Sequence, residues 1–173
     1  MPIWFGISPA GRYNSAQGMA SVFQKILLTT DLSADALRAF APVTELAHKL
    51  GSRITLMHVL PDLVLAPHGD PLAAPVHAPV DPIGQIESMT RDVTQRLEED
   101  ARRHFPGLDV EVYATSEADV ARAITRHAKE NGFDLIALSS HGRTGFRRMV
   151  LGSVAEAVLR HAEVPVLCFP RHG

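Results

Sequence analysis

The sequence predicts an α/β domain in which an open parallel sheet carries helices on both faces. Short, mostly apolar segments alternate along the chain with longer segments in which apolar residues recur every three or four positions. Strand and helix patterns in this alternation build β-α-β units, whose strands run parallel and whose crossovers are right-handed. The 173 residues, 46% of them apolar, suffice for one such domain.

The first predicted strand and helix follow a non-periodic N-terminal stretch. Residues 26–30 form a run that is apolar on both faces, as in a strand buried on both sides of a parallel sheet. Ser33 is suited to be the N-cap of a helix over 34–50, and Gly51 is a typical helix stop. Pro42 should kink or loosen one turn of this helix, because proline lacks a backbone N–H.

The second strand, predicted at 54–60, is followed by a long connection. Residues 61–82 contain six prolines, and a loop of this length in a compact domain is typically a lid, a binding loop or a locally disordered segment. A metal site at its histidines, His68 and His77, is the weaker alternative to a purely structural loop. The helix predicted next, over about 83–105, has apolar residues at helical spacing.

The third strand, predicted at 109–114, differs from the others because apolar and polar residues alternate along it. Val110 and Val112 are each followed by a polar or amphipathic residue, which indicates a less buried strand at a sheet edge. The next helix is expected to be capped by Ser116 with Asp119 and to end near Asn131-Gly132.

The last strand–helix–strand unit carries the most informative motif. A buried strand at 135–138 leads into a glycine-bearing loop, and then come a helix at 153–160 and a strand at 166–169. Gly142 and Gly145 allow tight turns in this loop, and backbone N–H groups at the following helix N-terminus can hold phosphate. Ser153 to Glu156 fits the capping box S-x-x-E, a structural role for Ser153 that is compatible with a phosphate contact.

Composition and missing motifs argue against several function classes. The net charge of −2 gives no general attraction to nucleic acid or anionic membranes, and no apolar run approaches the roughly 20 residues that span a bilayer. No P-loop, dinucleotide-binding glycine motif, nucleophile elbow or zinc-protease motif occurs. The single cysteine, Cys168, excludes an internal disulfide and points to a reducing, cytoplasmic setting. We expect residues 1–23 to be a flexible extension and residues 24–173 to form one domain.

Several segments together match one family pattern. They are Ile26 to Ser33, His58-Val59, Ser140 to Gly145 and Leu151 to Leu167. Through them the chain resembles the universal stress protein family over roughly residues 24 to 170. The resemblance implies a five-stranded parallel sheet of order 3-2-1-4-5, the adenine nucleotide α-hydrolase-like fold, in which the alternating third strand lies at an edge. It also places the topological switch point, where such sheets bind ligands, between the first and fourth strands.

The resemblance further implies an ATP site, with or without Mg²⁺, in that crevice. ATP-binding relatives carry G-x2-G-x9-G-[ST]; Gly142, Gly152 and Ser153 match it, whereas Ser139 replaces the first glycine and could crowd the turn or the ligand. By resemblance, Asp31 would bind the ribose hydroxyls or help place adenine, the backbone at 57–59 would meet adenine, and the loop would surround the phosphates. The expected contacts are Thr30, Asp31, Met57, Val59, Gly142, Arg143, Gly145, Gly152, Ser153 and Val154. No catalytic residue or protein metal ligand is expected.

The final strand predicts how the chain would assemble. Residues 164–169 carry no charge although the implied order puts them at a sheet edge, and the resembled family dimerises by antiparallel pairing of this strand. We therefore expect a symmetric homodimer that binds adenine nucleotide in a stress response, without nucleic acid or membrane partners. Two alternatives stay open: an enzyme that slowly hydrolyses ATP or transfers its adenylyl group, and a nucleotide-free interaction dimer, which Ser139 would favour. Binding is preferred to efficient catalysis because no placed general base or carboxylate pair is evident.

Overall fold

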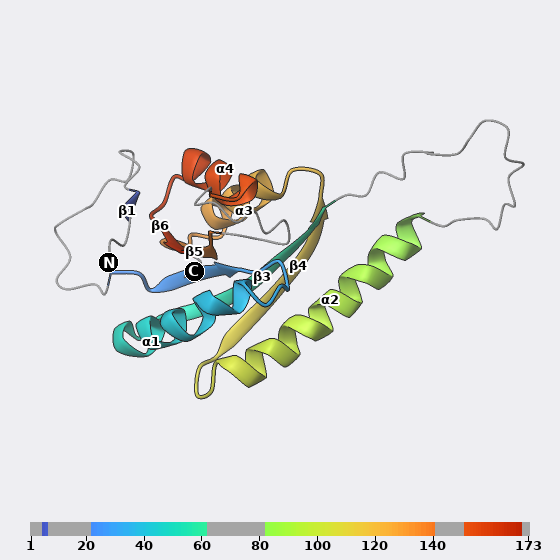
Figure 1. Cartoon of the computed structure of the whole chain (residues 1–173). Coiled ribbons are helices and arrows are strands. Elements are labelled where there is room, and N and C mark those ends of the chain that lie inside the picture. The colour runs from blue at the N-terminus through green and yellow to red at the C-terminus, as the bar shows by residue number, and fades with distance from the viewer. Residues whose placement is uncertain (1–4, 7–21, 62–81, 141–150, 171–173) are drawn as a thin grey trace, which may run out of the picture.

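The computed structural model describes residues 5–6, 22–61, 82–140 and 151–170. Strands and helices follow one another in the predicted order, after a short additional strand near the N-terminus (Figure 1). The strands are β1 (Phe5–Gly6), β2 (Lys25–Thr29), β3 (Arg53–Pro61), β4 (Val110–Glu117), β5 (Leu135–Ser139) and β6 (Val166–Phe169). The helices are the 3₁₀ turn η1 (Ala36–Ala39), α1 (Phe40–Leu50), α2 (Pro82–His104), α3 (Val120–Glu130) and α4 (Ser153–His161).

The strands β2 to β6 form the expected parallel sheet. The sheet order is β1-β6-β5-β2-β3-β4, and all neighbours from β6 to β4 run parallel. Counted along the chain from β2, this is the order 3-2-1-4-5, so the fold expectation is confirmed. β4, whose alternating sequence indicated an edge, is the outermost strand on its side. The antiparallel strand β1 was not expected, and it pairs with β6 at the opposite edge.

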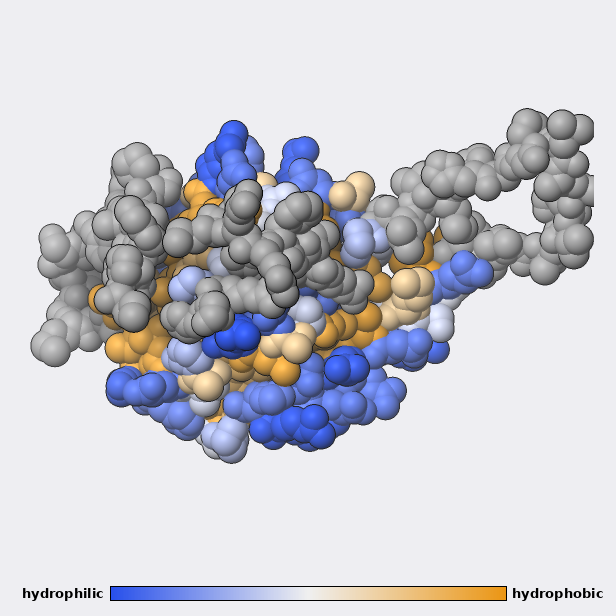
Figure 2. Space-filling view, viewed as in Figure 1, coloured by the Kyte–Doolittle hydropathy of each residue, from blue (hydrophilic) through white to orange (hydrophobic). Residues whose placement is uncertain are grey.

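Helices cover both faces of the sheet (Figure 1). Leu28 belongs to the core cluster between the sheet and the α1–α2 layer, to which Phe40 and Leu97 contribute from the helices. Leu27, whose side chain points to the opposite face, belongs to the cluster under α3 and α4, with Val158 from α4. Hydrophilic residues gather on the outer side of the α1–α2 layer, along the lower edge of Figure 2, and apolar residues are visible above them, toward the sheet.

The helix expected over 34–50 is divided into η1 and α1. Asp35, and not the expected Ser33, is the N-cap of η1, although the Ser33 Oγ accepts a hydrogen bond from the backbone N–H of Ala36 at 3.2 Å. The α-helical part begins only at Phe40. Pro42 therefore lies in the first turn of α1, where a backbone N–H has no partner within the helix in any case, and no kink inside a longer helix is needed.

The two residues expected to cap α3 have different roles. Asp119 is the N-cap, and its side chain accepts a hydrogen bond from the backbone N–H of Arg122 at 3.0 Å. Ser116 lies instead within β4, so its assignment to the cap was wrong. The strand extends to Glu117 because β3 continues beside it as far as Pro61 and supplies backbone partners.

Candidate functional site

The carboxyl ends of β2 and β5 form the switch point of the sheet. These strands are parallel neighbours, but the chain continues from β2 to α1 on one face and from β5 to α4 on the other (Figure 1). Connections that diverge in this way leave a crevice outside the strand ends, and open α/β sheets bind their ligands there.

A cavity of about 550 Å³ occupies this crevice. Residues from β2, β3, β5, α3 and α4 line it. Among them are seven of the predicted site residues: Thr30, Asp31, Met57, Val59, Gly152, Ser153 and Val154. The other predicted site residues, Gly142, Arg143 and Gly145, lie outside the described residues.

Further lining residues were not among the ten expected contacts, although His58 lies within the predicted 57–59 segment and Ser139 stands at the first motif position. These further residues are Thr29, His58, Pro61, Val120, Ile124, Leu138, Ser139, Ser140 and Ala155. Val120 and Ile124 lie one turn apart on α3, directly after its N-cap. This apolar i, i+4 pair was the sequence signal that could have indicated a lining role for these two residues. The spacing alone does not show that the start of the helix lies beside the cavity.

Asp31 lies in a tight turn directly after β2. Its Oδ1 accepts hydrogen bonds from the backbone N–H and the hydroxyl of Ser33, at 3.1 and 2.6 Å. Its Oδ2 is buried and has no hydrogen-bond partner among the described residues. A buried acceptor without a donor costs about 1–3 kcal/mol, and more when it is charged. This oxygen of the carboxylate can therefore accept a hydrogen bond from a donor in the cavity.

Several contacts fix the turn that carries Asp31. Leu32 adopts a φ of 62°, a left-handed conformation that costs a residue other than glycine about 1–2 kcal/mol. Its N–H donates a hydrogen bond to the Thr30 hydroxyl at 3.0 Å. Nδ1 of the buried His58 lies 2.7 Å from the Thr30 carbonyl oxygen, and since a carbonyl only accepts, Nδ1 carries the proton. The turn is thus bound to β3 and holds the carboxylate in one place.

β3 continues past the end of β2 and directs backbone groups to the crevice. The Thr30 N–H donates to the Met57 carbonyl at 2.9 Å, so the backbone of Met57 faces the β2 side. Successive residues of a strand direct their backbone groups to opposite neighbours. Val59, two residues further on, therefore directs its N–H and C=O to the side where β2 has already ended. Such a donor and acceptor pair can recognise the edge of a planar heterocycle.

α4 begins on the other side of the crevice, and no side chain caps its N-terminus among the described residues. Gly152 is the N-cap: its N–H donates to the Ser140 carbonyl and its own carbonyl accepts from the Glu156 N–H, both at 2.8 Å. The expected capping box was wrong, since Ser153 is the first helical residue and the Glu156 carboxylate pairs with Arg160. The helix itself starts at Ser153 as expected, and only its N-cap is one residue earlier than the capping box implied. The free N–H groups of this first turn, together with the helix dipole, favour an anion.

The cavity combines apolar and polar surfaces. Val59, Val120 and Ile124 contribute aliphatic side chains, and β5 and α4 contribute serine hydroxyls such as that of Ser153. Asp31 is the single acidic side chain among the described lining residues. A ligand with a flat apolar ring, hydroxyl groups and an anionic end fits this combination.

Other features of the described residues offer no comparable site. A hollow of about 530 Å³ on α2 is lined only by five charged side chains of that helix. No group of three or more His, Cys, Asp or Glu side chains is placed to hold a metal ion in the described ranges, and His68 and His77 lie outside them. No helix in the described part of the chain combines the length and apolar character needed to cross a membrane.

Sequence comparison with known proteins gives a consistent result. The model of the Universal stress protein family matches residues 23–170. Universal stress protein YxiE of Bacillus subtilis (strain 168) is 30% identical over 149 residues, which cover 84% of this chain and 98% of the relative. Universal stress protein MJ0577 of Methanocaldococcus jannaschii is 24% identical over 161 residues, which cover 88% of this chain and 98% of the relative.

Solved structures of universal stress proteins have the same fold. A family member from Burkholderia pseudomallei is 28% identical with a TM-score of 0.57, covering 87% of this chain and 98% of its own. A universal stress protein in complex with cAMP is 20% identical with a TM-score of 0.56, covering 88% and 100%. The universal stress protein of Archaeoglobus fulgidus in complex with dAMP is 19% identical with a TM-score of 0.51, covering 85% and 98%. These neighbours share the adenine nucleotide α-hydrolase-like fold.

Proposed function

Because the chain belongs to the universal stress protein family, we propose that it is a stress-response protein that binds ATP, with or without Mg²⁺, in the crevice between β2 and β5. Two structures of the same fold contain adenine nucleotides, cAMP in one and dAMP in the other. The observation that carries the proposal is the buried Oδ2 of Asp31, a residue that lines the cavity: this acceptor has no donor in the part of the chain that the structure describes.

In this proposal Asp31 accepts hydrogen bonds from the ribose hydroxyls. Ser33 already occupies Oδ1, so Oδ2 is the oxygen that remains for the sugar. Hydrogen bonds from hydroxyls to a carboxylate are charge-assisted and stronger than neutral ones. A ribose hydroxyl would therefore supply the donor that the unliganded turn lacks.

The adenine ring would lie between the apolar side of the cavity and the free end of β3. Val120 and Ile124 offer aliphatic surface for a flat ring. The backbone N–H and C=O of Val59 offer one donor and one acceptor, which match the adjacent acceptor and donor on the adenine edge. Met57 contributes through its position in the lining, since its carbonyl is already bonded to Thr30.

The phosphates would lie at the N-terminus of α4. Ser153 and Val154 are in its first turn and line the cavity. Family resemblance adds Gly142, Arg143 and Gly145 from the loop outside the described residues. Asp31 is the one carboxylate among the described lining residues, so Mg²⁺ would be held mainly by phosphate oxygens and water.

The proposed functional form is a cytoplasmic homodimer joined through residues 164–169. Its support is the family resemblance and the uncharged sequence of this edge strand. A nucleotide-free interaction dimer and a slow ATP-cleaving enzyme are the alternatives that the following experiment separates.

Isothermal titration calorimetry with ATP and Mg²⁺ tests the proposal on the full chain. We expect wild type to bind and Asp31→Asn to bind about tenfold to a hundredfold more weakly, since a hydrogen bond to a charged group contributes about 1.5–3 kcal/mol. Asp35→Asn is the matched control, because Asp35 is in the following turn, pairs with Arg38 and does not line the cavity. It should bind ATP like wild type.

Three outcomes separate the candidate functions. Absence of ATP binding by folded wild type would overturn the nucleotide part of the proposal and leave the interaction dimer. Equal losses in both variants would show that Asp31 has no specific role. Steady release of ADP or AMP that Asp31→Asn abolishes would instead establish the enzyme.

A further inference from the structure

Alternate residues of β6 direct their backbone groups away from the sheet. The Pro165 carbonyl accepts a hydrogen bond from the Ile136 N–H of β5 at 3.0 Å, so the backbone of Pro165 faces β5. Successive residues along a strand face opposite sides. Val166 and Cys168 therefore direct their N–H and C=O groups outward, and these four groups form what we call the β6 edge.

The β6 edge lacks the usual protection of an exposed strand. Val166 to Phe169 contains no charged side chain, and Leu167, Cys168 and Phe169 are only half-buried. Natural proteins commonly guard such edges with charges, bulges or covering segments, because a free apolar edge pairs with other chains. Some segment is expected to cover this one.

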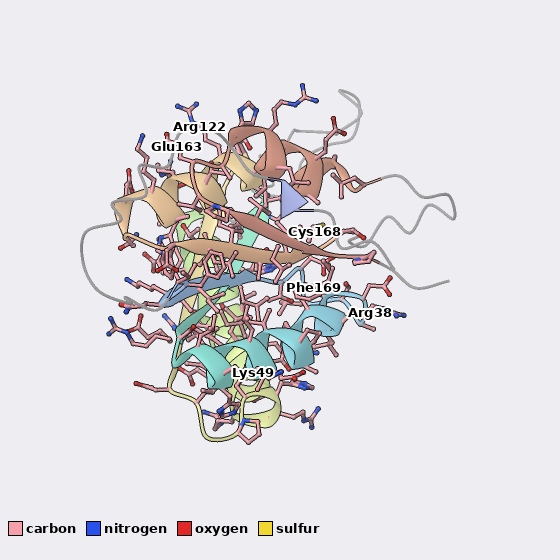
Figure 3. All side chains as sticks on the ribbon, turned by 90° about the vertical axis from the view of Figure 1, so that its left-hand side faces the viewer. Arg38, Lys49, Arg122, Glu163, Cys168 and Phe169 are labelled. Atoms are coloured by element: carbon pink, nitrogen blue, oxygen red, sulfur yellow. The ribbon has the colours of Figure 1, made fainter. Side chains whose placement is uncertain are left out.

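β1 supplies that cover in part. It pairs antiparallel with β6, with Phe5 opposite Leu167 and Gly6 opposite Val166. In Figure 3 the β1 arrowhead lies beside β6, next to the labelled Cys168. Because Val166 is an outward-facing residue, Gly6 and Val166 form the hydrogen-bonded pair, and Phe5 and Leu167 form the non-bonded pair.

We propose that β1 is an intramolecular plug of the β6 edge and competes there with β6 of a second copy of this chain. The inference rests on the homodimer part of the proposed function and adds a control on it. β1 shows that the edge accepts an antiparallel segment, which is the direction that two copies of β6 would have across a two-fold axis.

The two occupants differ in what they offer. β1 is two residues long and presents the backbone groups of Gly6 to the edge. A second β6 can pair at both Val166 and Cys168, but its binding costs the entropy of association of two molecules. β1 is part of the same chain, so its pairing costs only the smaller entropy of closing a loop. Dimerisation therefore depends on protein concentration and on how well β1 holds.

Gly6→Pro and Gly6→Ala form a matched pair of variants that tests the plug. Proline removes the one N–H with which β1 faces β6 and puts its ring at that contact, whereas alanine keeps the N–H. Sedimentation velocity from nanomolar to high micromolar protein gives the dimer dissociation constant of each full chain. We expect this constant to be about tenfold lower for Gly6→Pro than for wild type and Gly6→Ala.

A second substitution shows whether the released edge forms the dimer. Cys168→Pro removes an outward N–H and no hydrogen bond to β5, so Gly6→Pro/Cys168→Pro should return to the weak association of wild type. Hydrogen exchange of the Val166 and Cys168 amides provides a second measurement if that variant does not fold. In Gly6→Pro both amides should become protected at high concentration and exchange freely at low concentration.

The outcomes distinguish the plug from the dimer itself. The same dissociation constant in wild type, Gly6→Ala and Gly6→Pro would overturn the plug and leave the homodimer in place. No association of any variant at high micromolar protein would overturn both, while the ATP titration would remain an independent test of the nucleotide site.

Discussion

Asp31→Asn is expected to stabilise the unliganded protein while it weakens nucleotide binding. The Oδ2 atom of Asp31 is buried and has no donor among residues 22–61, 82–140 and 151–170, whereas Oδ1 accepts two hydrogen bonds from Ser33. Asparagine keeps an acceptor oxygen for Ser33 and replaces the buried anionic oxygen by a neutral amide nitrogen, whose burial without a partner costs less than that of a charged group.

The magnitude follows from two opposing terms. An unsatisfied buried group costs about 1–3 kcal/mol and a charged one more, so exchanging it for a neutral group should gain about 1–2 kcal/mol. The hydrogen bonds to Ser33 lose their charge assistance, which should cost about 0.5–1 kcal/mol. The net expectation is a free energy of unfolding about 0.5–1 kcal/mol higher than that of wild type.

Urea denaturation with and without ATP measures both effects. Without ligand Asp31→Asn should have the higher midpoint. With ATP at a hundred times the wild-type dissociation constant, wild type should gain about 2.7 kcal/mol and the variant clearly less, so the order of stability reverses. A variant that is less stable than wild type without ligand would refute the reasoning, because Asp31 would then serve the turn rather than a ligand. Equal gains with ATP would refute it as well.

Three further predictions concern residues away from the cavity. Gly51→Ala should lower the free energy of unfolding by about 1 kcal/mol through backbone strain alone, because Gly51 has a φ of 68° and no described atom lies within 4 Å of an added Cβ. Gly152→Ala is the control without this strain, since Gly152 has a φ of −62°. Equal stability of Gly51→Ala and wild type in urea would contradict the argument. Burial and, to a smaller extent, the charge of Lys25 lower the pKa of His127 in the folded protein. The unfolded chain therefore binds the proton first, and wild type should lose stability as the pH falls below about 6.5. His127→Gln should lose less stability between about pH 7.5 and 5, and parallel curves of unfolding free energy against pH for the two proteins would count against this prediction. Burial raises the pKa of Cys168 to about 11, so at pH 8 the folded protein should react with iodoacetamide on the order of a hundredfold more slowly than the unfolded chain. Mass spectrometry measures both rates, and equal rates would exclude a buried thiol.

Local sequence signals were reliable where the interaction they describe is local. Asp119 caps α3 through a side chain three residues from its partner, and Gly51 ends α1 in the left-handed conformation that glycine favours. The alternation along β4 likewise reports a property of one strand, its unequal exposure on two faces, and it indicated the sheet edge correctly.

The misassigned features depend on contacts between distant segments. Ser153 has the sequence of an N-cap, but Gly152, whose N–H donates to the Ser140 carbonyl, takes that position and Ser153 is the first helical residue. β1 has only two paired residues and no periodic pattern, so the sequence of residues 1–23 did not predict it. The family resemblance predicted Asp31 as a site residue, but not the structural feature that suits it to a ligand. That feature is a buried acceptor without a donor among the described residues, and it exists only when Ser33 and the ends of β2 and β3 are in place.

The candidate site and the candidate interface have the same physical origin in this sheet. At each, a strand presents backbone groups to a side that no neighbouring parallel strand occupies: Val59 where β2 has ended, and Val166 with Cys168 where the parallel sheet ends. Backbone donors and acceptors are stabilised by hydrogen-bond partners. The groups of Val59 therefore suit a ligand, and those of Val166 and Cys168 suit β1 or another chain. A short path of backbone hydrogen bonds joins the two regions, from Gly152 at the start of α4 to Ser140 and from the Ser140 N–H to the Phe169 carbonyl of β6, both at 2.8 Å. An anion bound at the α4 N-terminus would therefore act on a segment that is bonded directly to the edge strand. Because linkage is reciprocal, any effect of ATP on the proposed dimer constant would equal the effect of dimerisation on ATP affinity.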